Sequence, residues 1–72
     1  MKTTVDARGL SCPQPVIMAR QAIIKGGFPI EVRVDTVTSR ENVRRMAEMN
    51  NCLVDVRSEG DEFIVIIKEK TS

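Results

Sequence analysis

The sequence lacks histidine, tryptophan and tyrosine, and it contains only two phenylalanines and two cysteines among 72 residues. Without histidine, the chain cannot assemble a Ser-His-Asp triad, and no imidazole is present to act as a base in acyl transfer. A mixed Cys/His zinc site is excluded for the same reason, and two cysteines cannot complete a structural site made of cysteine alone. The composition therefore implies neither a metal nor an organic cofactor.

An excess of charge of one sign is also missing, because eleven basic and ten acidic residues leave a net charge of +1. This balance gives little long-range attraction to nucleic acid or to an acidic membrane surface. No stretch approaches the length of a membrane span, and residues 1–6 lack the apolar run of a signal peptide. Two cysteines are too few for a disulfide framework. We expect a cytoplasmic domain with reduced thiols, no membrane partner and no direct binding of nucleic acid.

The pattern of apolar residues predicts one small globular domain with four strands and two helices. Apolar and polar side chains alternate in the expected strands, and Gly, Asn and Pro mark where elements end. A Ser/Thr-x-x-Glu capping box places the N-cap of the second helix at Thr38 and Glu41 at its third position. The expected strands are 3–7, 30–35, 52–57 and 63–67, and the expected helices are 13–25 and 39–49.

The element order β-α-β-α-β-β predicts an α/β (α+β) fold, a two-layer sandwich with a mixed four-stranded sheet. Right-handed connections place both helices on one face of that sheet, and the last two strands form a hairpin around Gly60. The last strand is apolar throughout. Either it lies in the centre of the sheet, or Ile64 and Ile66 form an apolar patch with Leu53 on the open face. We favour the central position.

Cys12 lies at or just before the first turn of the first expected helix. Amide N–H groups and the helix dipole create a positive potential at that end, so the thiolate should be stabilised and its pKa lowered. Arg8 is close enough in sequence to add positive potential, and Gly9 allows a sharp turn before the cysteine. The site is therefore predicted to hold an ionised, accessible sulfur.

Two prolines flank the cysteine on its helical side, at Pro13 and Pro15. Neither has an N–H group, so Gln14 is the only backbone donor among the first three helical positions, and the rings restrict the backbone around Cys12. The other interpretation is that Cys12 is a small buried filler, as free cysteines often are. The Cys-Pro-Gln-Pro run argues against it, because a helix start is normally exposed and capped by polar groups.

The chemistry open to Cys12 is narrowed by what surrounds it in the sequence. No second cysteine lies two residues away, so exchange of the thioredoxin type is disfavoured. Histidine is absent, so acyl transfer has no imidazole base. What remains is a lone nucleophilic sulfur that accepts a group and passes it on.

At these residues the chain resembles the TusA/SirA-like sulfur-carrier family. The matching segment runs from Gly9 to Pro15, with the sequence GLSCPQP and the CPxP motif, and Asp6 stands at the family's leading aspartate. Length and element order extend the resemblance over residues 1–72 as a single carrier domain. The opening from Asp6 to Leu10 looks most like the YedF-like branch, which is linked to selenium metabolism and in which a second domain often follows.

This resemblance implies a sulfurtransferase-type carrier in which Cys12 holds a persulfide. The sulfur would come from a donor such as a cysteine desulfurase and pass to an acceptor protein of a sulfur relay. Family endpoints include tRNA thiolation, cofactor maturation and sulfur oxidation. A contrasting function is a non-catalytic RNA- or protein-binding module, suggested by three arginines on the second helix: Arg40, Arg44 and Arg45.

The remaining candidates concern packing and partners. Cys52 is predicted to be core filler, and the alternative is a resolving thiol for Cys12 in a redox domain, which needs a Cα separation below about 7 Å. On the second helix we expect ion pairs from Glu41 to Arg45 and from Arg44 to Glu48. On the first helix, the expected core stripe consists of Val16, Ala19 and Ile23.

A second stripe on the first helix consists of Ile17, Arg20 and Ile24, and Met18 lies beside it. If exposed, Ile17 and Met18 would form an apolar rim on which a partner docks near the sulfur. If buried, they would simply widen the core face of a helix that is apolar nearly all round.

Overall fold

The computed structural model describes residues 3–10 and 14–69, and within them it shows the expected order of elements. The strands are β1 (Thr3–Asp6), β2 (Ile30–Val34), β3 (Cys52–Glu59) and β4 (Glu62–Glu69), and the helices are α1 (Gln14–Lys25) and α2 (Val37–Met49). The sheet order is β1-β2-β4-β3, with β1 parallel to β2 and the other pairs antiparallel. The predicted two-layer α+β fold with a mixed sheet is confirmed.

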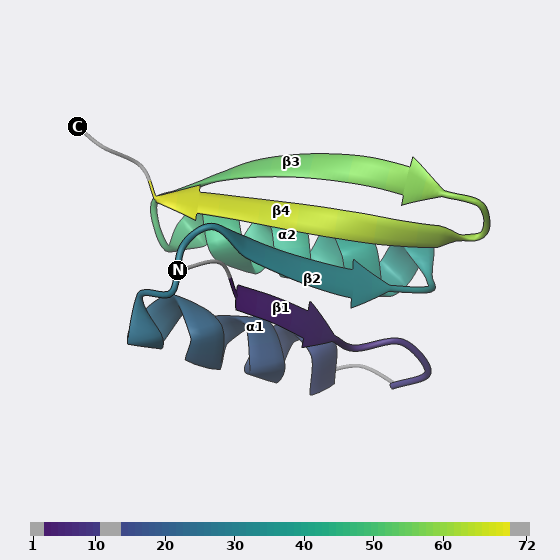
Figure 1. The fold of residues 1–72 in the computed structure, drawn as a ribbon, viewed down its shortest axis with the longest axis horizontal. Coiled ribbons are helices and arrows are strands. Elements are labelled where there is room, and N and C mark those ends of the chain that lie inside the picture. Colours follow the sequence, from purple (N-terminus) through teal and green to yellow (C-terminus); the bar gives the residue numbers. More distant parts are fainter. Residues whose placement is uncertain (1–2, 11–13, 70–72) are drawn as a thin grey trace.

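Both helices cover one face of the sheet and leave the other face open (Figure 1). The first helix packs against β1 and β2, the second against β3 and β4, and the two helices contact each other. They begin at the same end of the sheet, where β1 and β2 finish (Figure 1). Within the described residues, neither helix has the length and apolar character that crossing a bilayer requires.

The core lies between the sheet and the helices, and period-two alternation supplies it. Along β2 the even-numbered residues are buried and the odd-numbered ones are half-exposed, as predicted. On α1, Ala19 is buried, while Val16 and Ile23 are partly buried against the core. Pro15 and Ala22 of this helix are also buried and were not predicted. The buried hydrophobic residues are Val5, Ala7, Ala19, Ala22, Ile30, Val32, Val34, Val43, Ala47, Cys52, Val65 and Ile67, and Pro15 is also fully buried.

The central position of β4 confirms the preferred interpretation of its apolar run. Val65 and Ile67 face the helices and are fully buried. Ile64 and Ile66 face the open side and are half-buried. Charged residues of the two adjacent strands flank them, since Ile64 pairs with Arg33 and Arg57 while Ile66 pairs with Glu31 and Asp55. Leu53 is exposed and lies opposite Lys68, so charged side chains border the apolar ones on this face.

The turns follow from residues that tolerate positive φ. Gly60 has a φ of 60° in the β3–β4 hairpin, and Asn51 has a φ of 61° just after α2. The Asn50 side-chain amide donates to the Met46 carbonyl at 2.8 Å and completes the end of α2. Both turn predictions are therefore confirmed.

The predicted start of α2 is wrong by two residues. Thr36, with φ −134° and ψ 152°, is the N-cap, and its side chain accepts a hydrogen bond from the Ser39 amide at 3.1 Å. Thr38 lies inside the helix. The capping box fails because the Glu41 carboxylate does not turn back to the helix start. It pairs instead with Arg40 at 3.1 Å and with Arg44 at 2.8 Å.

Candidate functional site

The candidate site lies at the end of the sheet where β1 finishes and α1 begins (Figure 1). Cys12 and Pro13 lie outside the described residues, so the predictions for them are not tested by the geometry. The structure describes the segment from Asp6 to Leu10 on one side and Gln14 and Pro15 on the other. The described part of the site is therefore its two flanks.

Backbone contacts with β2 fix the first flank. The Ala7 amide donates to the Arg33 carbonyl at 2.9 Å and continues the β1–β2 pairing by one residue. The next turn needs Gly9, whose φ is 76°. A Cβ at Gly9 would meet nothing within 4 Å, so the requirement is conformational rather than spatial. We expect larger residues at this position to strain the segment that leads to Cys12.

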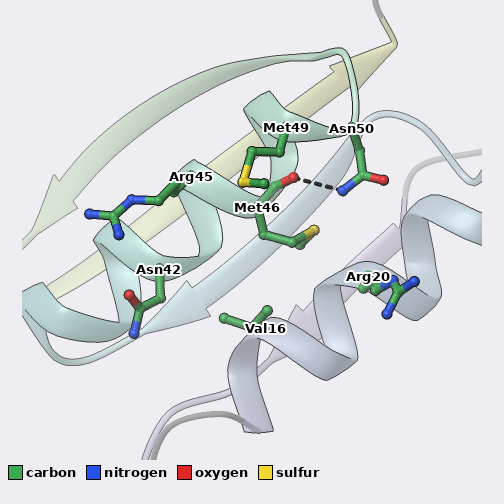
Figure 2. A pocket seen from close by; sticks show the side chains of 7 residues that line it. All are labelled: Val16, Arg20, Asn42, Arg45, Met46, Met49 and Asn50. Atoms are coloured by element: carbon green, nitrogen blue, oxygen red, sulfur yellow. Dashed lines mark hydrogen bonds between the residues drawn. The ribbon is translucent and has the colours of Figure 1, made fainter.

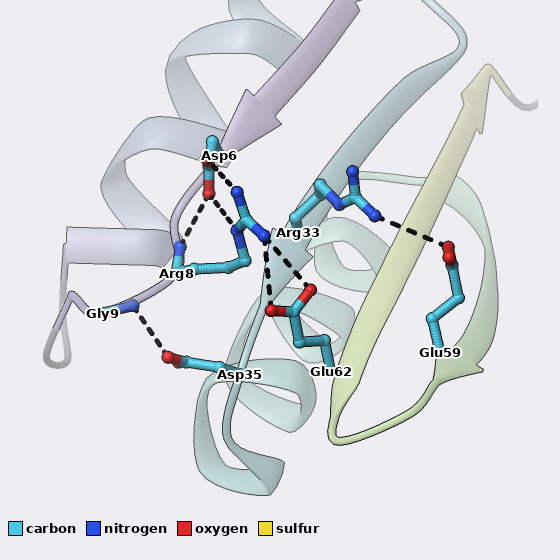
Figure 3. Close-up of polar contacts among 7 residues, drawn as sticks. All are labelled: Asp6, Arg8, Gly9, Arg33, Asp35, Glu59 and Glu62. Atoms are coloured by element: carbon cyan, nitrogen blue, oxygen red, sulfur yellow. Dashed lines mark hydrogen bonds and ion pairs between the residues drawn. The ribbon is translucent and has the colours of Figure 1, made fainter.

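An acidic side chain from the β2–α2 connection holds this turn. The Asp35 carboxylate accepts a hydrogen bond from the Gly9 amide at 2.9 Å (Figure 3). A charged acceptor makes this a stronger bond than a neutral one. The residue that follows β2 thereby restrains the segment three residues before Cys12.

Arg8 forms a compact ion-pair network on the same flank (Figure 3). Its guanidinium contacts both Asp6 carboxylate oxygens at 2.9 Å and reaches Glu62 at 3.3 Å, and its backbone amide donates to Asp6 at 3.2 Å. Hydrogen bonds from Arg8 lower the pKa of Asp6 from 3.8 to about 2, and the two carboxylates raise the pKa of Arg8. Because two anions compensate it, Arg8 offers less positive potential than the sequence analysis assigned to it.

The second flank is the first turn of α1. Gln14 is exposed, whereas Pro15 is fully buried. Pro15 therefore packs the start of the helix onto the sheet in addition to restricting the backbone. This packing role was not predicted, because the sequence pattern alone did not place the ring on the core side of the helix.

The side chains proposed as a partner surface divide between the two predicted environments. Ile17 is 44% exposed and Arg20 is exposed, whereas Met18 is half-buried against the core. Ile24, one helical turn beyond Arg20, is 73% exposed. The stripe of Ile17, Arg20 and Ile24 thus faces outward, and Met18 belongs mainly to the core.

Cys52 is core filler, as predicted. It is 8% exposed, and burial raises the pKa of its thiol, with a further contribution from Glu69. Across the sheet, Asp6 at the end of β1 is aligned with Arg57 of β3. The pairing runs from Asp6 to Arg33, from Arg33 to Ile64, and from Ile64 to Arg57. Five residue steps of β3 separate Arg57 from Cys52, or about 16 Å. The resolving-thiol alternative also involves Cys12, so it remains untested.

The arginines of α2 form a mostly neutralised face. Arg44 pairs with Glu41 at 2.8 Å and with Glu48 at 3.0 Å, which confirms the second predicted pair. The first predicted pair is wrong, because Glu41 turns to Arg40 and Arg44 and leaves Arg45 aside. Arg40 also lies 4.7 Å from the centroid of the Phe63 ring.

Two site residues, Asp35 and Glu62, were missed by sequence reasoning. Asp35 had a usable signal, because it directly follows a strand parallel to β1, and the carboxyl ends of parallel strands meet at one edge. Glu62 had none, since it is 54 positions from Arg8 and reaches it only through the strand order. Within the described residues, no three Cys, Asp or Glu side chains are grouped to hold a metal ion.

The sulfur transfer that the family resemblance implies should slow when the Asp35 carboxylate is removed, without unfolding of the domain. Asp35→Ala leaves the Gly9 amide without its acceptor, and we expect that transfer to be about two- to tenfold slower, in line with one exposed hydrogen bond. Asp35→Asn keeps an acceptor oxygen and should restore most of the rate. Single-turnover transfer assays and urea unfolding measure the two effects. Asp55→Ala, which removes an exposed pair with Lys68, is the matched control. Slow transfer by the control variant Asp55→Ala, or an unchanged transfer rate in Asp35→Ala, would refute this role.

The Asp6–Arg8 pair should make stability depend on pH only in the acid range. A carboxyl whose pKa falls from 3.8 to about 2 on folding stabilises the fold above about pH 4. That contribution is lost as pH falls from about 4 to about 2. Asp6→Asn should therefore lower the free energy of unfolding at pH 6, and the difference from the parent should shrink toward pH 2. A difference that is constant across this range would contradict the pairing.

Comparison with known proteins agrees with the fold and with the family resemblance. The family model described as Sulfurtransferase TusA matches residues 3–69. The crystal structure of a SirA-like protein from Desulfitobacterium hafniense superposes with a TM-score of 0.82 at 32% identity, covering 97% of this chain and 100% of that chain. No curated protein matches. The fold and the family match together show that this chain belongs to the TusA family of sulfurtransferases, which includes the SirA-like proteins.

Proposed function

We propose that this domain carries sulfur as a persulfide on Cys12. The observation that carries the proposal is the TusA family match over residues 3–69, which encloses the Cys12-Pro13-Gln14-Pro15 motif. The described flanks support it, because Gly9 and Asp35 restrain one side of the motif and the buried Pro15 restrains the other. A carrier needs such restraint to present one sulfur to successive partners.

The transfer balances without an oxidant, a reductant or a general base. The Cys12 thiolate attacks the terminal sulfur of a persulfide on the donor protein. The bond between that sulfur and the donor cysteine breaks, and the donor leaves as a thiolate. A thiolate of the acceptor then attacks the terminal sulfur on Cys12 in the same way, so the absence of histidine is no obstacle.

The partners follow from this chemistry. We propose a cysteine desulfurase as the donor and a sulfur-relay protein as the acceptor, meeting in the cytoplasm where thiols stay reduced. The acceptor decides between tRNA thiolation, cofactor maturation and selenium-related metabolism. The YedF-like opening from Asp6 to Leu10 favours the last of these.

Two of the three arginines that suggested RNA binding are neutralised, which weakens the RNA-binding alternative. Arg40 and Arg44 are paired with acids on the same helix, and the sequence has no tyrosine or tryptophan on which bases could stack. Binding of RNA with a steep salt dependence, unchanged by Cys12→Ser, would revive it.

Mass spectrometry tests the proposal directly. The chain is incubated with a cysteine desulfurase and cysteine, and the intact mass and the Cys12 peptide are measured. We expect a gain of one sulfur atom on that peptide, reversed by a thiol reductant. The control is a parallel reaction in which the same donor loads another carrier. If that carrier gains sulfur while the mass of this chain stays unchanged, the persulfide function is rejected.

A further inference from the structure

A groove of about 470 Å³ lies between α1 and α2 and is lined by side chains of both helices (Figure 2). Val16 lines it from the first turn of α1, and Met46 and Met49 line it from the second half of α2. Val16 and Met46 are half-buried against the core, whereas Met49 is 78% exposed. Methionine side chains adapt to the shape of whatever packs on them. These three side chains therefore give the groove an apolar and adjustable floor, and Asn42 and Asn50 of the α2 side also line it.

Two cationic side chains line the groove beside these apolar residues. Arg20 lines the groove from α1 and Arg45 lines it from α2, and both are exposed (Figure 2). Neither has an ion-pair partner within the described part of the chain. By contrast, acids pair with four other arginines of the domain: Arg8, Arg33, Arg40 and Arg44. Two unpaired arginines of the helical layer thus line one apolar groove, while Lys25, at the end of α1, lies outside it.

We infer that this groove docks an acidic segment of a protein partner, with carboxylates on Arg20 and Arg45 and an apolar side chain over Met46 and Met49. Charge complementarity selects carboxylates, and the apolar floor selects a protein segment over a nucleic acid, whose phosphates and riboses would leave it uncovered. The inference rests on the proposed function, since the partner is taken to be a protein of the sulfur relay.

The position of the groove fits that role. Val16 is on the first turn of α1, at the end of the sheet where the Asp6–Leu10 segment also lies (Figure 1). A segment seated in the groove would extend from this end toward the C-terminal half of α2 and would be anchored beside the motif. The exposed Ile17 and Ile24 on α1 would add apolar contacts at its edge.

Titration of the ¹⁵N-labelled 72-residue chain with a synthetic peptide tests the inference. The probe is an amphipathic peptide of about twelve residues in which glutamates flank leucines, and its counterpart has glutamine at each glutamate position. We expect amide shifts centred on the groove residues Val16, Arg20, Arg45, Met46 and Met49, weakened by added salt. Shifts elsewhere, or equal binding of the glutamine peptide, would overturn the inference.

A charge reversal supplies the matched control. Arg45→Glu should weaken peptide binding about fivefold or more, as expected when an exposed ion pair is replaced by repulsion. Arg57→Glu makes the same change on β3, on the open face of the sheet, and should leave binding unchanged. Equal effects of the two variants would overturn the inference. Tighter binding of tRNA than of the peptide, or a dimer in sedimentation that Arg45→Glu abolishes, would replace the proposed occupant with RNA or a second copy.

Loading with inorganic polysulfide separates this inference from the carrier function. Polysulfide reacts with the thiolate without docking of a protein. Cys12 of the Arg45→Glu variant should therefore gain sulfur to the same extent as Cys12 of the parent chain. A parent chain that loads but does not bind the acidic peptide would refute the groove and leave the carrier intact. A parent chain that binds the peptide but is loaded by neither polysulfide nor a desulfurase would refute the carrier instead.

Discussion

Cys12→Ser is expected to abolish sulfur loading by a cysteine desulfurase. A serine hydroxyl is a poor nucleophile toward sulfur and cannot hold a sulfane sulfur, and the only other thiol is Cys52. That thiol is buried, and its pKa is raised by burial, so it should not substitute for Cys12. The expected loss is complete, within the detection limit of intact-mass measurement.

The matched variant is Cys52→Ala, which removes the other thiol and leaves the motif unchanged. We expect it to load sulfur at close to the parent rate, with a modest loss of stability from the shortened side chain. If Cys12→Ser still gained a sulfur, or if Cys52→Ala did not, the assignment of the carrier residue would be wrong. Circular dichroism of both variants shows whether either change has unfolded the domain.

Ile67→Ala is expected to destabilise the domain by about 2–5 kcal/mol. Ile67 is fully buried in the central strand and pairs with Ile30 of β2 and Val54 of β3. Truncation removes its contacts with the helical layer and leaves a cavity that packed neighbours fill only in part. Since a core of this size supplies only about 3–5 kcal/mol of net stability, much of the population should unfold.

Two variants keep this prediction measurable if Ile67→Ala does not fold. Ile67→Val removes one methyl group and should cost about 0.5–1.5 kcal/mol in urea unfolding. Ile66→Ala makes the larger truncation on the open face, where the side chain is half-buried, and should cost about 1 kcal/mol. If Ile66→Ala were as damaging as Ile67→Ala, the open face would be covered, contrary to the fold described here.

Much of this fold is predictable from the sequence, because its signals are local. Ile30, Val32 and Val34 alternate with charged residues and face the helices as expected. Gly60 and Asn51 mark turns because few residues tolerate positive φ. The central strand β4 is recognisable from its run of apolar residues, because side chains on both of its faces are at least partly buried.

The errors arise where two local signals compete or where the partner is distant. Thr36 and Thr38 both carry a hydroxyl group that could cap a helix. The backbone is extended at Thr36, which is the N-cap, and the Glu41 carboxylate that the capping box required pairs with Arg44 instead. Spacing alone did not distinguish Arg44 from Arg45 as the partner of Glu41. The contact between Arg8 and Glu62 depends on the topology, which brings the start of β4 to the end of β1.

The pH dependence of Cys12 alkylation tests the central claim most directly. The rate of iodoacetamide modification at Cys12 and Cys52 is followed by peptide mass spectrometry from about pH 5 to 10, with Cys52 as the internal reference for a buried thiol. We predict a midpoint for Cys12 below about 8.5, the value of free cysteine, because the helix start stabilises the thiolate. A midpoint at or above that value, or a rate as slow as that of Cys52, would contradict an accessible, ionised sulfur at Cys12.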